Sequence, residues 1–219
     1  MSSGAETEVG APSADWRRQR RTGMATIAAA AVVAACLWIA IRAFAPPIAG
    51  METLGARMLF ALKYLCLATL FCLVTGVEAV AHERLQSAAF DPLAGFETKR
   101  LRVNLRYLQN TLEQLIVFGV GLFGLAAYSA DGAAMRAVEA TTVTWIVARW
   151  AFWLGYHRSA AMRGLGAPSM AISLIVLLYV AARIGADAAG IAGAVGIVLA
   201  FLAFEALLFR ATHAKSPPA

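Results

Sequence analysis

Two clusters of polar side chains interrupt an otherwise apolar sequence. The first has the spacing R-x3-R-x3-N-x2-E-Q and comprises Arg102, Arg106, Asn110, Glu113 and Gln114. At about 100° per residue, a helix places the first four of them within an arc of about 80°, so they share one face. Guanidinium, amide and carboxylate groups on one face suit a polar, anionic ligand that also carries an amino group.

The second cluster has the spacing A-R-x2-F-x2-G-Y-x-R-S-A-x2-R and comprises Arg149, Phe152, Gly155, Tyr156, Arg158, Ser159 and Arg163. Arg149 and Tyr156 are seven residues apart, so a helix places them on one face. Polar groups in hydrocarbon are costly unless they are paired or face a wet cavity. Because both clusters are expected at the same end of a helix bundle, we predict that they form one ligand site.

Each of these residues also has a purely structural interpretation. Arginines at helix ends reach toward lipid headgroups, an asparagine can bridge two helices, and a tyrosine can belong to an interfacial aromatic belt. The combination favours a site, because Glu113 and Arg149 each lie about two turns inside an expected helix.

The elements that must position these clusters are membrane helices. Apolar residues make up 60% of the 219 residues and charged residues only 15%, and the mean hydropathy is +0.68. These values lie outside the range of ordinary soluble domains. Runs of about 20 apolar residues are long enough to span a bilayer, and we expect six of them, over residues 24–45, 57–81, 108–128, 137–156, 169–184 and 190–210.

The N-terminal segment, residues 1–22, is polar and is expected to be a disordered cytoplasmic tail. It ends in the basic sequence WRRQRR just before the first apolar run. A signal peptide has the same order of segments, but the run 24–45 is long enough to cross the membrane, which favours a retained anchor. Pro46 and Pro47 are expected to end this helix.

The net charge of +6 reflects topology rather than nucleic-acid binding, because the basic residues lie in short segments beside apolar runs. Segments on one side of the predicted membrane hold only Arg42, Arg57, Arg136 and Arg183. The richer side, with both termini and both polar clusters, is therefore expected in the cytoplasm, which in a bacterium means the inner membrane. The three cysteines lie in apolar runs without a CxxC motif, so neither a metal site nor a disulfide framework is expected.

The clusters resemble those of a known family. The stretch RYLQNTLEQ (106–114) is similar to the second core helix of the MAPEG family, the membrane-associated proteins of eicosanoid and glutathione metabolism. The stretch ARWAFWLGYHRSAAMR (148–163) is similar to the end of the third core helix in the cysteinyl leukotriene synthase branch. The resemblance covers residues 57–184 as a four-helix core, with 24–45 and 190–210 as additional helices.

The resemblance implies a homotrimer with glutathione as co-substrate, bound between subunits near the cytoplasmic face. Arg106, Asn110 and Glu113 would contact the tripeptide, Tyr156 would enclose it, and Arg163 would lie beside its thiol. The expected activity is a glutathione-dependent transferase or peroxidase acting on a lipophilic small molecule. The alternative is a non-enzymatic protein that binds an anionic membrane lipid or a small anion through the same arginines.

One departure from the family pattern concerns Phe152, which stands where a tyrosine is frequent in the family. The missing phenol removes any role that its hydroxyl would have.

Overall fold

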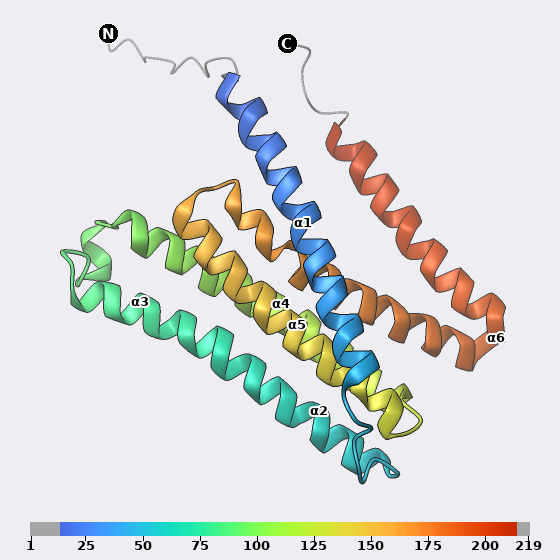
Figure 1. The fold of residues 1–219 in the computed structure, drawn as a ribbon. Helices are drawn as coiled ribbons and strands as arrows, with labels where there is room; N and C mark the ends of the chain where they lie inside the picture. The colour runs from blue at the N-terminus through green and yellow to red at the C-terminus, as the bar shows by residue number, and fades with distance from the viewer. Residues whose placement is uncertain (1–13, 214–219) are drawn as a thin grey trace.

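Every regular element in the described part of the chain is a helix (Figure 1). The computed structural model describes residues 14–213. Its elements are α1 (Ala14–Phe44), α2 (Leu54–Ala68), the π-helical η1 (Thr69–Val74), α3 (Thr75–Leu85), the short η2 (Pro92–Ala94), α4 (Lys99–Tyr128), α5 (Gly132–Arg158), η3 (Met162–Gly166) and α6 (Ala167–His213). The all-α class predicted from the sequence is confirmed.

Four of these helical stretches are long and apolar enough to cross a membrane. They cover Trp16–Phe44, Leu54–Leu85, Lys99–Tyr128 and Met162–Thr212. Helix α5 is not one of them. Its sequence contains Glu139, Arg149 and three threonines within the four residues TTVT (141–144), which lower its hydropathy. The structure is therefore that of an all-α protein compatible with a membrane, and the count of six spans stays a prediction.

Helix α6 is two helices joined by a sharp break. Ala189 and Gly190 have non-helical backbone angles, and Gly190 has φ 62°, a conformation that glycine adopts without a steric penalty. The break lies after the predicted run 169–184 and coincides with the start of the predicted run 190–210. In contrast, α2, η1 and α3 follow one another without an interruption of helical backbone angles.

Helix α1 begins earlier than predicted. Residues 14–22, expected to belong to a disordered tail, form its first turns. Within these turns the Arg20 guanidinium lies 5.7 Å from the centroid of the Trp16 ring, a cation–π contact at the i,i+4 spacing that supports a helix. Residues 1–13 of the predicted tail lie outside the described residues. The helix ends at Phe44, before the two prolines, as predicted.

The bundle is built around α4 and α5. Helix α4 packs on α2, α3, α5 and α6, while α1 lies across α5 and η3 (Figure 1). The stacked rings of Phe118 and Trp145, with centroids 4.7 Å apart, join α4 to α5 in the core. Trp38 Nε1 donates to Thr141 Oγ1 at 3.1 Å and fixes α1 on α5. The C-terminal half of α6 turns away from the other helices.

A close backbone contact positions η3 on the end of α5. A Cβ atom added to Gly155 would clash with the carbonyl oxygen of Met162, so only glycine permits this approach. The same contact holds Arg163, which follows Met162 in η3, over the end of α5.

We predict that Gly155→Ala lowers the free energy of unfolding by about 1–3 kcal/mol, because the added methyl group displaces backbone rather than a mobile side chain. Thermal unfolding of the purified protein in detergent measures the change. Gly196→Ala is the matched control, because nothing lies within 4 Å of its added Cβ, and it should be neutral or stabilising by up to about 1 kcal/mol. Equal effects of the two substitutions would contradict the contact.

Candidate functional site

A polar cavity of about 450 Å³ opens between α4, α5, η3 and α1. Helices α4 and α5 and the η3 segment bring residues that are distant in sequence to its wall. Six of the residues predicted from the two clusters line it, namely Arg106, Asn110, Glu113, Gln114, Tyr156 and Arg163. The fold therefore joins the two clusters in one cavity.

Three other predicted site residues do not line this cavity. Arg102 lines a smaller hollow beside it, together with Arg106 and Gln109. Arg149 is fully buried behind the cavity wall. Arg158 is exposed at the end of α5 and lines neither hollow.

The cavity also contains residues that the sequence did not single out as ligand contacts. Gln109 donates from Nε2 to Glu113 Oε1 at 3.2 Å. Its position four residues before Glu113 places it on the same helix face, and this spacing could have indicated that it lines the cavity. Phe152 contributes an apolar ring from α5. Ile27 comes from α1, and no pattern in the sequence connects that helix with the polar clusters.

The Arg149 side chain organises the wall behind the cavity. Its Nη1 donates to Asn110 Oδ1 at 2.9 Å, and its Nη2 donates to Thr111 Oγ1 at 2.7 Å. Nη1 also lies 3.5 Å from Ser169 Oγ in α6. The guanidinium stacks over the ring of Phe152, 4.6 Å from its centroid. One side chain of α5 thus connects α4 with α6.

Neutral side chains complete this network. Ser169 Oγ donates to Gln114 Oε1 at 2.7 Å, and Gln114 Nε2 donates to Asn110 Oδ1 at 3.2 Å. Because the Asn110 oxygen accepts from both Arg149 and Gln114, the orientation of this amide is determined before any ligand binds.

Arg149 is a buried cation without a paired carboxylate among the described residues, and its Nε has no hydrogen-bond partner there. One acidic residue, Glu113, lines the cavity, and its carboxylate accepts from Gln109 rather than from Arg149. Arg149 therefore places a positive charge behind the cavity wall, and this charge favours a ligand with negative charge.

We predict that Arg149→Ala destabilises the protein by about 3 kcal/mol, because the substitution removes the donor to the buried Thr111 Oγ1 and one of the two donors to Asn110 Oδ1, and leaves a cavity between α4, α5 and α6. Thermal unfolding in detergent measures this loss. Arg158→Ala, on the exposed end of the same helix, is the control and should change stability by less than about 0.5 kcal/mol. A loss for Arg149→Ala as small as that of the control would contradict the network.

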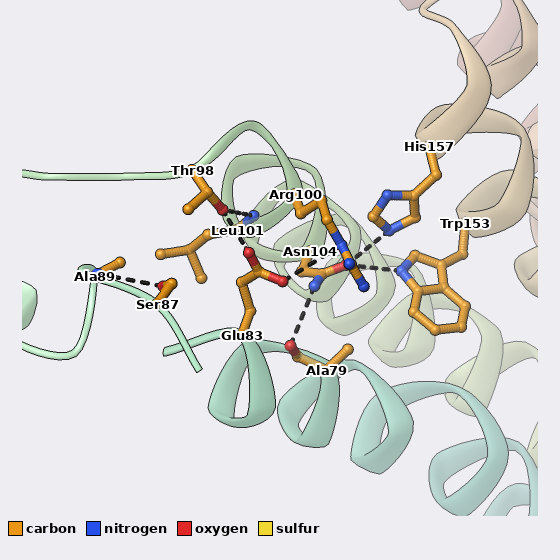
Figure 2. Close-up of polar contacts among 10 residues, drawn as sticks. All are labelled: Ala79, Glu83, Ser87, Ala89, Thr98, Arg100, Leu101, Asn104, Trp153 and His157. Carbon is orange, nitrogen blue, oxygen red and sulfur yellow. Dashed lines mark hydrogen bonds and ion pairs between the residues drawn. The ribbon is translucent and has the colours of Figure 1, made fainter. Parts of the chain in front are cut away.

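A separate group of polar side chains, distinct from the two sequence clusters, holds α3, α4 and α5 together near the start of α4 (Figure 2). Asn104 Nδ2 donates to Ala79 O at 3.1 Å. Its Oδ1 accepts from Trp153 Nε1 and lies 2.9 Å from His157 Nε2. Since an amide oxygen can only accept, His157 Nε2 carries a proton.

A carboxylate anchors the start of α4 in the same cluster. Glu83 accepts from the Thr98 hydroxyl at 2.7 Å and pairs with Arg100 at 3.4 Å. Thr98 is the N-cap of α4 and accepts from Leu101 N at 2.9 Å. These contacts determine where α4 enters the bundle and hence where Arg106 lies.

Burial lowers the pKa of His157 below its ordinary value of 6.5, the charge of Arg100 lowers it further, and Glu83 partly opposes the change. The folded state therefore binds fewer protons than the unfolded state just below pH 6.5. We predict that stability is greatest above about pH 6.5 and falls as the pH decreases from there toward the lowered pKa.

Thermal unfolding at pH 7.5 and 5.5 tests this dependence, and His157→Gln should make it weaker. His82→Gln is the control, because His82 is exposed and pairs only with Glu78. If both substitutions leave the dependence unchanged, His157 is not its source.

The described residues contain no group of three or more His, Cys, Asp or Glu side chains arranged to hold a metal ion. No family model, curated protein or solved structure matches this chain. The fold and the cavity define an all-α protein with long apolar helices, compatible with a membrane. The cavity among its helices is lined by two arginines and several other polar residues.

Proposed function

We propose that this chain is a MAPEG-like integral membrane protein that binds glutathione in the polar cavity and conjugates it through its sulfur to a lipophilic electrophile, or uses it to reduce such a molecule. The observation that carries the proposal is the convergence of the two family-like stretches on one cavity. Arg106, Asn110 and Glu113 enter it from α4, Tyr156 from α5 and Arg163 from η3.

The charges of the cavity suit the charges of glutathione. The tripeptide carries two carboxylates, one ammonium group and one thiol. Arg106 and Arg163 complement the negative groups, and Glu113 complements the ammonium group. A volume of about 450 Å³ lies within the ordinary range for small-ligand sites.

Arg163 is the residue proposed to stabilise the thiolate. A free thiol with a pKa of about 8.5 is only slightly ionised at neutral pH, and a nearby guanidinium increases the thiolate fraction. In conjugation, the sulfur forms a bond to the electrophilic carbon, and the displaced electron pair leaves with a leaving group or takes a proton. In peroxide reduction, the sulfur attacks one oxygen, the O–O bond breaks to give an alcohol, and a second glutathione yields the disulfide and water.

Phe152 supplies no hydroxyl to this chemistry, and its ring instead stacks on the Arg149 guanidinium. Tyr156 is then the phenol of the cavity wall that is available to a bound ligand.

The same proposal includes six membrane spans, a homotrimer, and a cavity on the cytoplasmic side of a bacterial inner membrane. The break in α6 at Ala189 and Gly190 supports two separate C-terminal spans, and the uneven distribution of arginines supports the orientation.

Turnover of a chromogenic electrophile by the purified full chain in detergent, with glutathione, tests the proposal. Arg163→Ala should reduce turnover about 10²-fold and shift its pH profile upward, because the thiolate loses its neighbouring charge. Arg210→Ala, at the exposed end of α6, is the control. Turnover that is unaffected by Arg163→Ala would exclude this arginine as the thiolate stabiliser.

A second candidate function is non-catalytic binding of an anionic lipid. The observation that favours it is a basic hollow of about 400 Å³ in which Arg163 lies together with Trp16 and Arg20 of α1. This function predicts thermal stabilisation by phosphatidylglycerol and none by glutathione. Stabilisation by glutathione alone would exclude it.

A further inference from the structure

The connection between α3 and α4 exposes large apolar side chains. Phe90 is 68% exposed, Leu93 is 93% exposed and Phe96 is 52% exposed, and Leu85 at the end of α3 is 68% exposed. A single exposed apolar residue is ordinary at a protein surface, whereas several in one short segment indicate contact with another apolar medium. We call residues 85–98 the apolar loop.

The tip of the apolar loop is a defined turn. Asp91 is the N-cap of η2, and its Oδ1 accepts from Leu93 N at 2.9 Å. Gly95 ends the turn with φ 70°, a left-handed conformation that glycine adopts without a steric penalty. Because the turn is already formed, little conformational entropy is lost when Leu93 enters a binding surface.

The base of the apolar loop is fixed to the bundle. Ala89 is 1% exposed and packs with Val80 of α3 and Leu101 of α4. Its amide donates to Ser87 Oγ at 3.2 Å (Figure 2). Phe90, the next residue along the chain, lies outside this buried cluster. The fold thus buries a small residue and leaves a large aromatic one outside, which is the reverse of what burial away from water favours.

Both ends of the apolar loop coincide with ends of candidate membrane spans. The preceding span has 32 residues and ends at Leu85, and the following span begins at Lys99. A helix of the first length is about 48 Å long, and a bilayer with its headgroup regions is about 40–45 Å thick. In a bilayer that these helices cross, the loop therefore lies at the level of the headgroups. It does so at the end of the bundle opposite the break in α6 (Figure 1).

The charges at the base of the apolar loop favour an anionic surface. Residues 84–102 contain four basic residues and two acidic ones, namely Arg84, Lys99, Arg100 and Arg102 against Asp91 and Glu97. The Arg100 side chain stays 78% exposed although it pairs with Glu83, and Lys99 and Arg102 are exposed as well. Basic residues beside exposed apolar ones are typical of segments that lie on anionic membranes.

We propose that the apolar loop is a membrane-surface anchor that binds the anionic leaflet beside it. Phe90, Leu93 and Phe96 enter the headgroup region, and the basic residues at the base of the loop lie beside lipid phosphates. An anionic bilayer fits both properties of the loop, because it offers an apolar layer and negative charge at the depth where the loop emerges. The proposal rests on the membrane placement included in the proposed function and does not depend on glutathione.

A fluorophore at the tip of the loop tests the proposal. The variant Leu93→Cys, in a full chain that also carries Cys36→Ala and Cys66→Ala, is labelled with the environment-sensitive dye NBD and placed in nanodiscs of phosphatidylglycerol and phosphatidylcholine. Cys72 is buried and stays. Phospholipids with a nitroxide near the headgroup should quench the dye several-fold more strongly at position 93 than in the control Arg158→Cys. Arg158 is exposed at the same end of the bundle, since its neighbour His157 contacts Asn104 near the start of α4.

Equal quenching at the two positions, or a dye at position 93 that iodide in the buffer quenches as strongly as at the control, would overturn the proposal. A blue shift that grows with protein concentration in detergent would also overturn it, because a second copy then covers the loop. Nanodiscs of phosphatidylcholine alone should reduce the lipid quenching several-fold. Unchanged quenching there would overturn the preference for anionic headgroups.

Substitution of the neighbouring aromatic residues gives a second test. With the dye at position 93, Phe90→Ser together with Phe96→Ser should reduce lipid quenching several-fold. Thermal stability in detergent should change little, because both side chains are exposed. Phe44→Ser is the control, because Phe44 is 87% exposed at the other end of the bundle. Equal quenching in the control and the double variant would contradict the role of the two aromatic residues.

Glutathione titration of the same samples separates the anchor from the proposed function. Insertion of the dye without binding of glutathione overturns the proposed function and leaves the anchor. Glutathione-dependent turnover with a water-exposed dye overturns the anchor and leaves the function. A chain that stays monodisperse in buffer without detergent or lipid overturns the membrane placement common to both.

Discussion

A fully buried guanidinium, which has no paired carboxylate within residues 14–213, is the main constraint on this bundle. Burying a charge in a medium of low dielectric constant is costly, and Arg149 offsets part of the cost through hydrogen bonds to Asn110 and Thr111 and through stacking on Phe152. Because Asn110 and Thr111 lie on α4 while Ser169 lies on α6, these contacts determine how both helices meet α5. The same contacts orient the amide that faces the polar cavity.

The cavity depends on this arrangement and on close backbone contacts at its edge. Gly155 lets η3 approach α5, and this approach holds Arg163 beside the residues of α4. Near the start of α4, Asn104 and Glu83 connect the helix with α3 and α5. Polar contacts at both ends of the site thus position a set of charged side chains that are themselves exposed enough to meet a ligand.

Helix α1 has a larger role than its sequence suggested. It was expected as an additional helix outside a four-helix core, yet Ile27 lines the polar cavity, and Ala30 and Ala34 line an apolar hollow between α1 and α5. Helix α1 is therefore part of the cavity wall as well as an additional helix.

The sequence by itself determined the helical class, the apolar runs and the face shared by Arg106, Asn110 and Glu113, because hydropathy and helical periodicity are local properties. Proline likewise determined the end of α1 through its missing amide hydrogen. Only the tertiary structure decided that Arg149 lies behind the cavity, that Arg158 lies outside it, and that Ile27 belongs to it. These outcomes depend on the rotation and crossing of helices, which are set by packing between residues far apart in the chain and leave no periodic signal in any one segment.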